Sequence, residues 1–338
     1  MAGVAVLGAT GMVGQRLVAM LRDHPFFELR ALCASDRSAG RPYAEAAPWR
    51  LEGEEADWVA DWRVRECRPE ALPDDVDIVL SALPTGEAKA LEPVFAEAGL
   101  VVVSNAGAYR QDPRVPLIIP EINPDHLAMT ATQPWAGALI TNPNCCAVPL
   151  AMALAPLHAA FGVEAACVST WQAVSGAGYP GESAWDMVGN VHPHPGDEEE
   201  KLGVEPQKIL GAPGAPASFV TSARCVRVNS ADGHLVSAQL SLRGNPSPER
   251  VMEALRDFTP RGPALPSSPT PLFHFSDRRD RPAPRFDAGR GRGMTVTIGR
   301  VEACAVMGVK LYALAHNTVR GAAGAALANA ELWTLQAR

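Results

Sequence analysis

The sequence predicts an α/β protein of two domains, and three observations carry this prediction. The chain has 338 residues, more than the roughly 100–200 that typically form one domain. Its first third alternates short apolar runs with helical stretches. Its middle changes to longer strand-like runs, joined by loops rich in proline and glycine. We therefore expect a parallel-sheet domain followed by an α+β domain.

The first domain is expected to contain parallel strands linked by helices. Residues 4–7 form a short apolar run, followed by a glycine-rich turn and a helix over about residues 11–21. Further strands are expected at 27–33, 76–82 and 100–104. Strands separated by such crossovers indicate a sheet with helices on its faces. This is the Rossmann-type, nucleotide-binding architecture.

The second domain is expected to hold a largely antiparallel or mixed sheet. Its strands are predicted at 166–174, 221–228, 235–242 and 294–301. The alanine-rich segment 318–336 has strong helix propensity and is predicted to close the chain as a helix.

Composition excludes several classes of function. A net charge of −7 argues against a general affinity for nucleic acid or anionic membranes. The arginine-rich stretch 277–292 also carries acidic residues and has few aromatics for bases to stack on, so a solvated or subunit-contacting loop is favoured. The start of the chain lacks the layout of a signal peptide, and no apolar run reaches the roughly 18 residues of a membrane span. We expect a cytoplasmic protein with neither a nucleic-acid nor a membrane partner.

The cysteines and histidines give no metal signature. The seven cysteines are scattered without a CxxC pair, which fits neither a disulfide framework nor a zinc module. His192 and His194 lie near the acidic run 197–200, but Pro193 and Pro195 make their geometry awkward and the spacing matches no common site. No metal is expected.

A glycine-rich turn at residues 8–14 indicates a dinucleotide site. Gly8, Gly11 and Gly14 separate the first strand from the first helix. Glycines there allow a tight turn and close approach of a pyrophosphate, while the helix N-terminus offers unpaired N–H groups. A plain βα turn is the alternative interpretation.

The end of the second strand bears on the choice of nicotinamide cofactor. NAD enzymes usually place an acidic side chain there to bind the ribose hydroxyls. Here Ser35, Arg37 and Ser38 are able to donate to a 2′-phosphate, and Arg37 adds a charged planar fork. Asp36 is the acid that an NAD enzyme would use. NADP is favoured, with Asp36 as a capping or solvent-facing residue.

Cys145 is the candidate nucleophile. It precedes a long apolar stretch, residues 147–157, that is typical of a helix. A helix N-terminus stabilises a thiolate through its dipole and its backbone donors. Cys146 is expected to point elsewhere and pack. Two buried cysteines at a helix start would be the alternative interpretation.

Arg227 and His234 support a catalytic interpretation. Arg227 lies in a strand-like run and His234 follows an Asp-Gly turn, so a bend could bring both to one place. An arginine binds a carboxylate bidentately, and a histidine is the usual acid or base near neutral pH.

Ten motifs in order resemble the aspartate-β-semialdehyde dehydrogenase family, in its archaeal and fungal branch, along nearly the full chain. They are GATGMVGQRL at 8–17, SNAGAYR at 104–110, VPLIIPEIN at 115–123, NPNCC at 142–146, QAVSGAGYPG at 172–181, DEEEK at 197–201, KILG at 208–211, RVNSADGH at 227–234, RPAPRFD at 281–287 and NTVRGAAGAA at 317–326.

The resemblance implies roles for the matching residues. Cys145 would form a thioester, His234 would be the acid/base and Gln172 would orient the thioester. Arg227 would bind the substrate's α-carboxylate and Glu198 its amino group. The phosphate would be surrounded by Lys201, Arg110 and Asn144. NADP(H) would be held by Gly8, Thr10, Gly11, Met12, Val13, Ser35, Arg37, Ser38, Ser81, Ser175, Gly176, Gly178 and Asn317, the last on a C-terminal helix that returns to the first domain.

The reaction implied is the NADPH-dependent reductive dephosphorylation of aspartyl-4-phosphate to aspartate-4-semialdehyde. The implied domains are a dinucleotide-binding domain at 1–145 plus 317–338, and a catalytic and dimerisation domain at 146–316. The implied assembly is a homodimer or homotetramer.

Three departures from the family pattern leave the acyl donor open. They are Cys146-Ala147 after the nucleophile, the segment 189–195, and Glu205-Pro206-Gln207. One alternative is the same chemistry on malonyl-CoA, a succinate-semialdehyde-type donor or another acyl phosphate. A second is a nucleotide-binding protein without catalysis. The joint presence of Cys145, Gln172, Arg227 and His234 argues against the second.

Overall fold

The structure, a computed structural model, describes residues 1–53, 56–193 and 195–336. It divides into two compact units. Unit 1 comprises Met1–Ile118, Asp125–Asn142 and Ala322–Arg338, and unit 2 comprises Ile119–Pro124 and Pro143–Gly321. Among the described helices, none has the length and apolarity required to cross a membrane.

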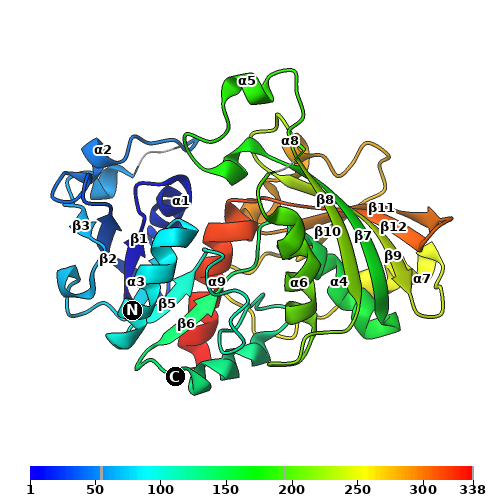
Figure 1. The fold of residues 1–338 in the computed structure, drawn as a ribbon, viewed down its shortest axis with the longest axis horizontal. Coiled ribbons are helices and arrows are strands. Elements are labelled where there is room, and N and C mark those ends of the chain that lie inside the picture. The colour runs from blue at the N-terminus through cyan, green and yellow to red at the C-terminus, as the bar shows by residue number, and fades with distance from the viewer. Residues whose placement is uncertain (54–55, 194, 337–338) are drawn as a thin grey trace. The chain divides into compact units, whose positions relative to one another are not determined.

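Unit 1 is a parallel six-stranded sheet in the order β3-β2-β1-β4-β5-β6 (Figure 1). Its side chains in β1, β4 and β5 are buried on both faces, as expected where helices cover a sheet on both sides. Its strands are β1 (Ala2–Leu7), β2 (Phe27–Ala34), β3 (Arg65–Glu66), β4 (Ile78–Ser81), β5 (Val101–Ser104) and β6 (Ala138–Thr141). Its helices are α1 (Met12–Leu21), α2 (Tyr43–Ala46), α3 (Thr85–Glu97) and α9 (Gly324–Gln336). The Rossmann-type prediction is confirmed.

The C-terminal helix α9 packs against β4, β5 and α1 of unit 1, which confirms its predicted return. Its start was predicted wrongly. Residues 319–323 form a π-helical turn, and the α-helix begins only at Gly324. Asn317 therefore lies in the turn before the helix and not on it. The Gly321 N–H bonds to the His316 carbonyl oxygen, five residues earlier, at 3.0 Å, which is the π-helical pattern. A Cβ at Gly321 would come 2.7 Å from the Cβ of Cys145, a tertiary contact that helix propensity does not reveal.

Unit 2 is a mixed six-stranded sheet in the order β10-β11-β12-β9-β7-β8. The pairs β7·β8 and β10·β11 are parallel and the others antiparallel, which confirms the mixed-sheet prediction. The strands are β7 (Val163–Gln172), β8 (Val220–Arg227), β9 (His234–Leu242), β10 (Phe273–Ser276), β11 (Val296–Cys304) and β12 (Gly308–Ala315).

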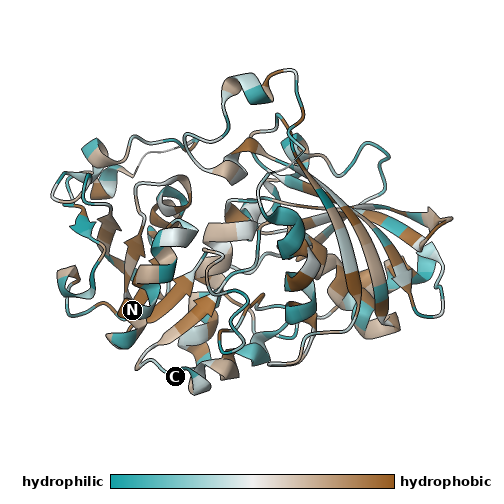
Figure 2. Ribbon diagram, in the orientation of Figure 1, coloured by the Kyte–Doolittle hydropathy of each residue, from teal (hydrophilic) through white to brown (hydrophobic). Residues whose placement is uncertain are grey.

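Three helices line one face of this mixed sheet. Helix α4 (Ala147–Phe161) packs on β9 and β12, with α6 (Glu198–Leu210) and α7 (Pro248–Arg256) on either side of it. Along β7 and β9, buried side chains alternate with partly or fully exposed ones. In Figure 2 the strands of this sheet carry many brown, apolar residues, whereas α6 is largely teal. Short helices are α5 (Ala184–Met187) and α8 (Pro284–Asp287), and 3₁₀ turns occupy Asp57–Val59, Pro69–Ala71, Pro124–Thr132, Val174–Ala177 and Arg290–Gly293.

One edge of the mixed sheet gathers the residues that carry chemistry. Gln172 and Arg227 end two parallel strands and are register partners. His234 begins β9, antiparallel to β7, and pairs with Ala315 at the end of β12. Strand pairing alone therefore brings Gln172, Arg227 and His234 to a single edge.

Unit 2 contains a buried ion pair between Arg320 and Glu121. Arg320 donates from both terminal nitrogens to the two carboxylate oxygens of Glu121, each at 2.8 Å. Burial opposes ionisation of Glu121, but the charge and hydrogen bonds of Arg320 outweigh it and hold the pKa of that carboxyl below its ordinary value. The pair joins the short segment Ile119–Pro124 to the turn that packs on Cys145.

Candidate active site

Cys145 lies immediately before helix α4 and is held there by its neighbours. The Asn144 side-chain oxygen accepts from the backbone N–H groups of Cys146 and Ala147, at 2.9 and 3.3 Å, and so caps the helix. The Asn144 backbone N–H donates to the buried carboxylate of Glu205 at 2.6 Å. Cys145 is partly exposed, whereas Cys146 is completely buried. The predicted helix start and the predicted packing of Cys146 are both present.

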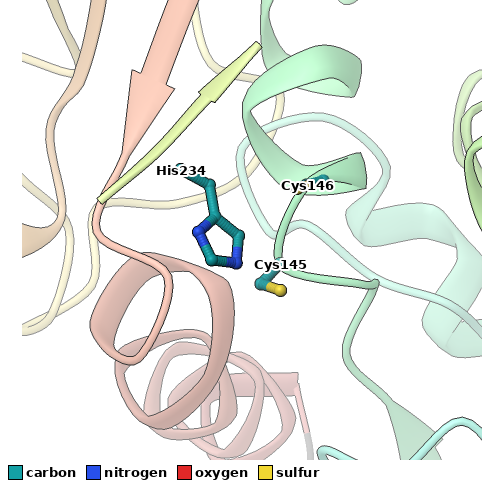
Figure 3. Close-up of side chains that lie close together, drawn as sticks. All are labelled: Cys145, Cys146 and His234. Atoms are coloured by element: carbon teal, nitrogen blue, oxygen red, sulfur yellow. The ribbon is translucent and has the colours of Figure 1, made fainter. Parts of the chain in front are cut away.

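His234 is buried beside Cys145 (Figure 3). Its Nδ1 accepts the backbone N–H of Ala173 at 3.0 Å. Since a neutral imidazole carries one proton, this contact places the proton on Nε2. Within the described ranges, Nε2 has no hydrogen-bond partner. A buried donor without a partner is rare and indicates a ligand or reacting group.

Gln172 and Glu198 link Arg227 to Lys201 through hydrogen bonds. Arg227 Nη1 donates to Gln172 Oε1 at 3.1 Å. Gln172 Nε2 donates to Glu198 at 3.3 Å, and Glu198 also accepts from Asn144 Nδ2 and from Lys201 Nζ at 2.9 Å. Predicted residues from the segment before α4 and from α6, β7 and β8 thus form one connected network.

The charges in this network are compensated. Lys201 lies 2.6 Å from Asp197 and 2.9 Å from Glu198. Burial opposes the charge on its ammonium group, but the two carboxylates outweigh that cost and raise the pKa of Lys201 above its ordinary value. The ammonium group is therefore positively charged throughout the neutral range and able to attract an anion.

Gly176 separates Arg227 from His234. A Cβ at this position would come 2.7 Å from Arg227 Nη1 and 3.0 Å from His234 Nε2, so only glycine leaves both side chains where they are. Arg227 Nε is also buried without a hydrogen-bond partner in the described part of the chain, and the nearest carboxylate oxygen, from Glu182, is 3.9 Å away.

Ser175 and Asn317 meet beside the same edge. Asn317 Nδ2 donates to Ser175 Oγ at 2.8 Å, and Ser175 Oγ donates to Asp232 at 2.7 Å. Asn317 also accepts the Gly233 N–H at 2.8 Å and so fixes the turn that precedes His234. Gly178 comes directly after the 3₁₀ turn Val174–Ala177, and its φ of 73° lies in the left-handed region that favours glycine.

The predicted dinucleotide residues of unit 1 lie at the carboxyl ends of its strands. Gly8 has φ +72°, and a Cβ on Gly14 would lie 2.1 Å from the Gly8 carbonyl oxygen, so this turn requires glycine at both places. Thr10, Gly11, Met12 and Val13 run from it into α1, and Ser35, Arg37 and Ser38 follow β2 with Ser35 and Arg37 exposed.

Ser81 and Arg110 also belong to this edge of unit 1. Ser81 ends β4 beside Ser104, which ends β5. Arg110 donates to the carbonyl of Asn105 at 2.7 Å, and Asn105 donates to the carbonyl of Ser81 at 2.9 Å. Arg110 belongs to unit 1 and the Cys145 network to unit 2.

Glu92, a buried residue of α3, is expected to make the stability of unit 1 depend on pH. Burial raises the pKa of its carboxyl to about 7, although it accepts a hydrogen bond from Ser104 at 2.6 Å. Because the folded state holds this proton more tightly than the unfolded state, stability falls as pH rises from 4.5 towards about 7. Relative to Glu92→Gln, the wild type should lose up to about 3 kcal/mol across this window. Urea unfolding at pH 5 and pH 8 would test this, and parallel pH profiles would contradict it.

His192, in the 189–195 segment, lies beside the end of strand β8. The backbone of His192 pairs with that of Arg227, and its ring lies 3.8 Å from Glu182. His194 lies outside the described residues. Elsewhere in the described ranges, the ligand atoms of Cys145, Cys146 and His234 lie within 4.8 Å of one another.

Two contributors, Glu205 and Asp232, were not among the predicted site residues. Glu205 holds the Asn144 backbone and Asp232 holds Ser175. Glu205 lies seven residues after Glu198, two helical turns along α6, so the spacing would place both on one face. Asp232 lies in the Asp-Gly turn, where its contact with Ser175 depends on tertiary structure.

Comparison with known proteins matches both units. The NAD-binding domain model of the semialdehyde dehydrogenases matches residues 3–130, and their dimerisation domain model matches residues 154–320. Aspartate-semialdehyde dehydrogenase of Methanothermobacter thermautotrophicus is 44% identical over 344 residues, covering 98% of this chain and 99% of that protein. The chain thus has the two domains of a semialdehyde dehydrogenase.

Solved structures of similar fold and sequence support the same family. Aspartate-semialdehyde dehydrogenase from Candida albicans, crystallised with NADP, has a TM-score of 0.88 and 37% identity over 99% of this chain and 98% of that chain. The second enzyme of this name from Vibrio cholerae, complexed with ASA, has a TM-score of 0.79 and 28% identity over 99% and 98%. The chain belongs to the aspartate-semialdehyde dehydrogenase family, and the resemblance seen in its motifs is confirmed.

Proposed function

We propose that the protein catalyses the reversible, NADPH-dependent reductive dephosphorylation of L-aspartyl-4-phosphate to L-aspartate-4-semialdehyde through a thioester on Cys145. One observation carries this proposal. Two buried donors in the described residues, Arg227 Nε and His234 Nε2, have no hydrogen-bond partner. Their side chains lie on either side of Gly176, and His234 also lies beside the Cys145 thiol. A substrate with a carboxylate at one end and a reactive carbonyl at the other supplies an acceptor for each.

The residues of unit 1 fit NADP(H). The Gly8 turn and the N-terminus of α1 suit a pyrophosphate. The Arg37 side chain, flanked by Ser35 and Ser38, is exposed at the end of β2 and suits a 2′-phosphate. Ser81 in unit 1, with Ser175, Gly176, Gly178 and Asn317 in unit 2, would complete the cofactor site. The Candida albicans relative, solved with NADP, supports this choice. When bound, the cofactor supplies the hydride.

In the first half-reaction, the Cys145 thiolate attacks the acyl carbon and the C–O bond to phosphate breaks. The products are a thioester and inorganic phosphate, which takes one proton from solvent. Lys201, Asn144 and Arg110 would surround the phosphate, and the charged Lys201 would offset its negative charge. Arg227 would hold the α-carboxylate and Glu198 the amino group, with Gln172 between them.

In the second half-reaction, the thioester carbon gains a hydride and its oxygen becomes an alkoxide. His234 Nε2–H is the donor placed to stabilise that oxygen, since Ala173 keeps Nδ1 occupied. Collapse of the alkoxide releases the aldehyde and regenerates the thiolate without a further proton. With this tautomer His234 would act as a hydrogen-bond donor, and the acid/base role that the family resemblance implies would require the Ala173 contact to break.

Arg227→Lys should raise KM for the amino-acid substrate at least tenfold and change kcat only a few-fold. The bidentate guanidinium becomes a point charge that cannot hold a carboxylate in one orientation. Steady-state kinetics would measure this. Arg224→Lys is the matched control on the same strand, because Arg224 is exposed and contacts Glu199. Equal KM changes in both variants would contradict the assignment.

Substrate identity is tested with the purified protein. NADP⁺, phosphate and aspartate semialdehyde should give rapid formation of NADPH, and malonyl-CoA with NADPH should give no turnover. Turnover with malonyl-CoA but not with aspartate semialdehyde would show that malonyl-CoA, and not aspartyl phosphate, is the acyl donor. Absence of turnover with either, together with tight NADPH binding, would favour a non-catalytic role.

For assembly, the proposed partner is a second copy of the chain. The family model that spans 154–320 is a dimerisation domain. On the sheet face of unit 2 opposite α4, Trp171 and Tyr312 are half-buried and in ring contact at 6.3 Å, a surface suited to homodimer or homotetramer formation. Residues 146–316 would then be the catalytic and dimerisation domain, and 1–145 with 317–338 the dinucleotide-binding domain. Seven cysteines as thiols suit a reducing cytoplasm.

A further inference from the structure

Cys146 contains a second thiol that the proposed reaction does not use. It is completely buried, adjacent in sequence to Cys145, and hydrogen-bonded to it. Burial and the neighbouring thiol raise the pKa of Cys146 well above its ordinary value. The site therefore contains one partly exposed thiol, and one that remains protonated directly behind it. Figure 3 shows Cys146 at the start of α4, next to Cys145.

Cys145, Cys146 and His234 resemble a zinc ligand set, with ligand atoms within 4.8 Å of one another. The His234 ring argues against metal binding. Because Nδ1 accepts the Ala173 N–H, the proton lies on Nε2, and the nitrogen that faces the cysteines has no lone pair to offer. Coordination of a metal through Nε2 would move the ring proton to Nδ1, where it would point at the backbone N–H of Ala173. The arrangement is suited to thiol chemistry.

We propose that Cys145 and Cys146 form a reversible vicinal disulfide that protects the nucleophile from irreversible oxidation by peroxide. This inference rests on the proposed function, because it needs Cys145 to be the reactive thiolate. Hydrogen peroxide converts the Cys145 thiolate to a sulfenic acid and is itself reduced to water. The Cys146 sulfur then attacks the Cys145 sulfur, an S–S bond forms, the S–O bond breaks, and the Cys146 proton leaves with the hydroxyl as water.

The geometry makes this disulfide short-lived. Consecutive Cα atoms are about 3.8 Å apart across a trans peptide, whereas relaxed disulfides usually span roughly 4.4–6.8 Å. The bond is therefore strained and easily reduced by cellular dithiols. A sulfinic acid on Cys145 would instead be permanent. Cys146 would thus convert permanent inactivation into a recoverable state.

Peroxide treatment of the full-length enzyme tests the proposal. Wild type, Cys146→Ala and Cys146→Ser are exposed to hydrogen peroxide, quenched with catalase and assayed before and after dithiothreitol. We expect all three to lose activity, wild type to recover most of it, and the recovered fraction to be at least about fivefold lower in both Cys146 variants. Cys225→Ala removes another buried thiol of unit 2 and should recover like wild type.

Mass spectrometry supplies a readout that does not depend on turnover. After peroxide and alkylation, the wild-type peptide with residues 145 and 146 should lack two hydrogens and resist alkylation until reduced. Sulfinic acid on Cys145 with an alkylatable Cys146, or equal recovery in wild type and Cys146→Ala, would overturn the proposal. Zn²⁺ is measured after dialysis in wild type and Cys146→Ala. If wild type retains one Zn²⁺ per chain and the variant loses it, the three residues bind zinc and the proposal is overturned. If the disulfide forms in a protein that does not turn over aspartate semialdehyde, the substrate assignment is wrong and the disulfide proposal stands.

Discussion

Cys145→Ser should lower kcat at least about 1,000-fold, equivalent to roughly 4 kcal/mol of barrier, while NADPH binding stays within a few-fold of wild type. A serine hydroxyl is not ionised at neutral pH and cannot replace a thiolate as nucleophile or leaving group. The packing against Gly321 and the Asn144 cap involve the Cβ and backbone of this region, so the fold should be retained. Stopped-flow kinetics and fluorescence titration with NADPH would measure the two quantities.

The control for this prediction is Cys146→Ala, which should keep activity within a few-fold of wild type. Because Cys146 is buried and takes no part in the proposed reaction, its loss removes only a small apolar group. Equal loss of activity in both variants would show that the nucleophile is assigned wrongly.

Arg320→Met should destabilise the protein by about 3–5 kcal/mol at neutral pH. The substitution leaves the Glu121 carboxylate buried and charged with its bidentate partner removed. Without Arg320, burial would raise the pKa of Glu121, so the variant should recover part of the lost stability as pH falls and the carboxyl takes up a proton. Chemical unfolding at pH 7.5 and pH 5 would measure both effects.

The double variant Glu121→Gln/Arg320→Met separates charge from packing. If the uncompensated charge causes the loss, the double variant should be more stable than Arg320→Met alone. Equal destabilisation of the two variants would show that lost packing against Met152, which Arg320 also contacts at 2.9 Å, is the main term.

The parallel sheet of unit 1 could be predicted because its strands are short, continuous apolar runs, as doubly covered strands require. Strand β12 (Gly308–Ala315) was not predicted, although Val309, Leu311 and Ala313 alternate as buried residues and that pattern was available. Strand β3 has only two residues, too short for periodicity to define it. Strands β6 and β10 were also not predicted, although each has four residues, the length of the predicted strands β4 and β5.

The site was predictable residue by residue, but its connections were not. The helix start at Cys145 follows from local sequence. The meeting of Gln172 and Arg227 depends on parallel pairing of β7 with β8, which no local pattern specifies. The His234 ring orientation depends on one backbone N–H at Ala173. Such contacts arise only when separate elements pack together.

The acyl enzyme itself is the most direct test of the account. Wild-type protein mixed with aspartyl phosphate or a stable acyl-phosphate analogue, without NADPH, should acquire one acyl group that peptide mass spectrometry places on Cys145. Adding NADPH should remove it as the aldehyde, and Cys145→Ser should never acquire it. An adduct on Cys146 or another residue, or full turnover without any covalent adduct, would contradict the thioester mechanism.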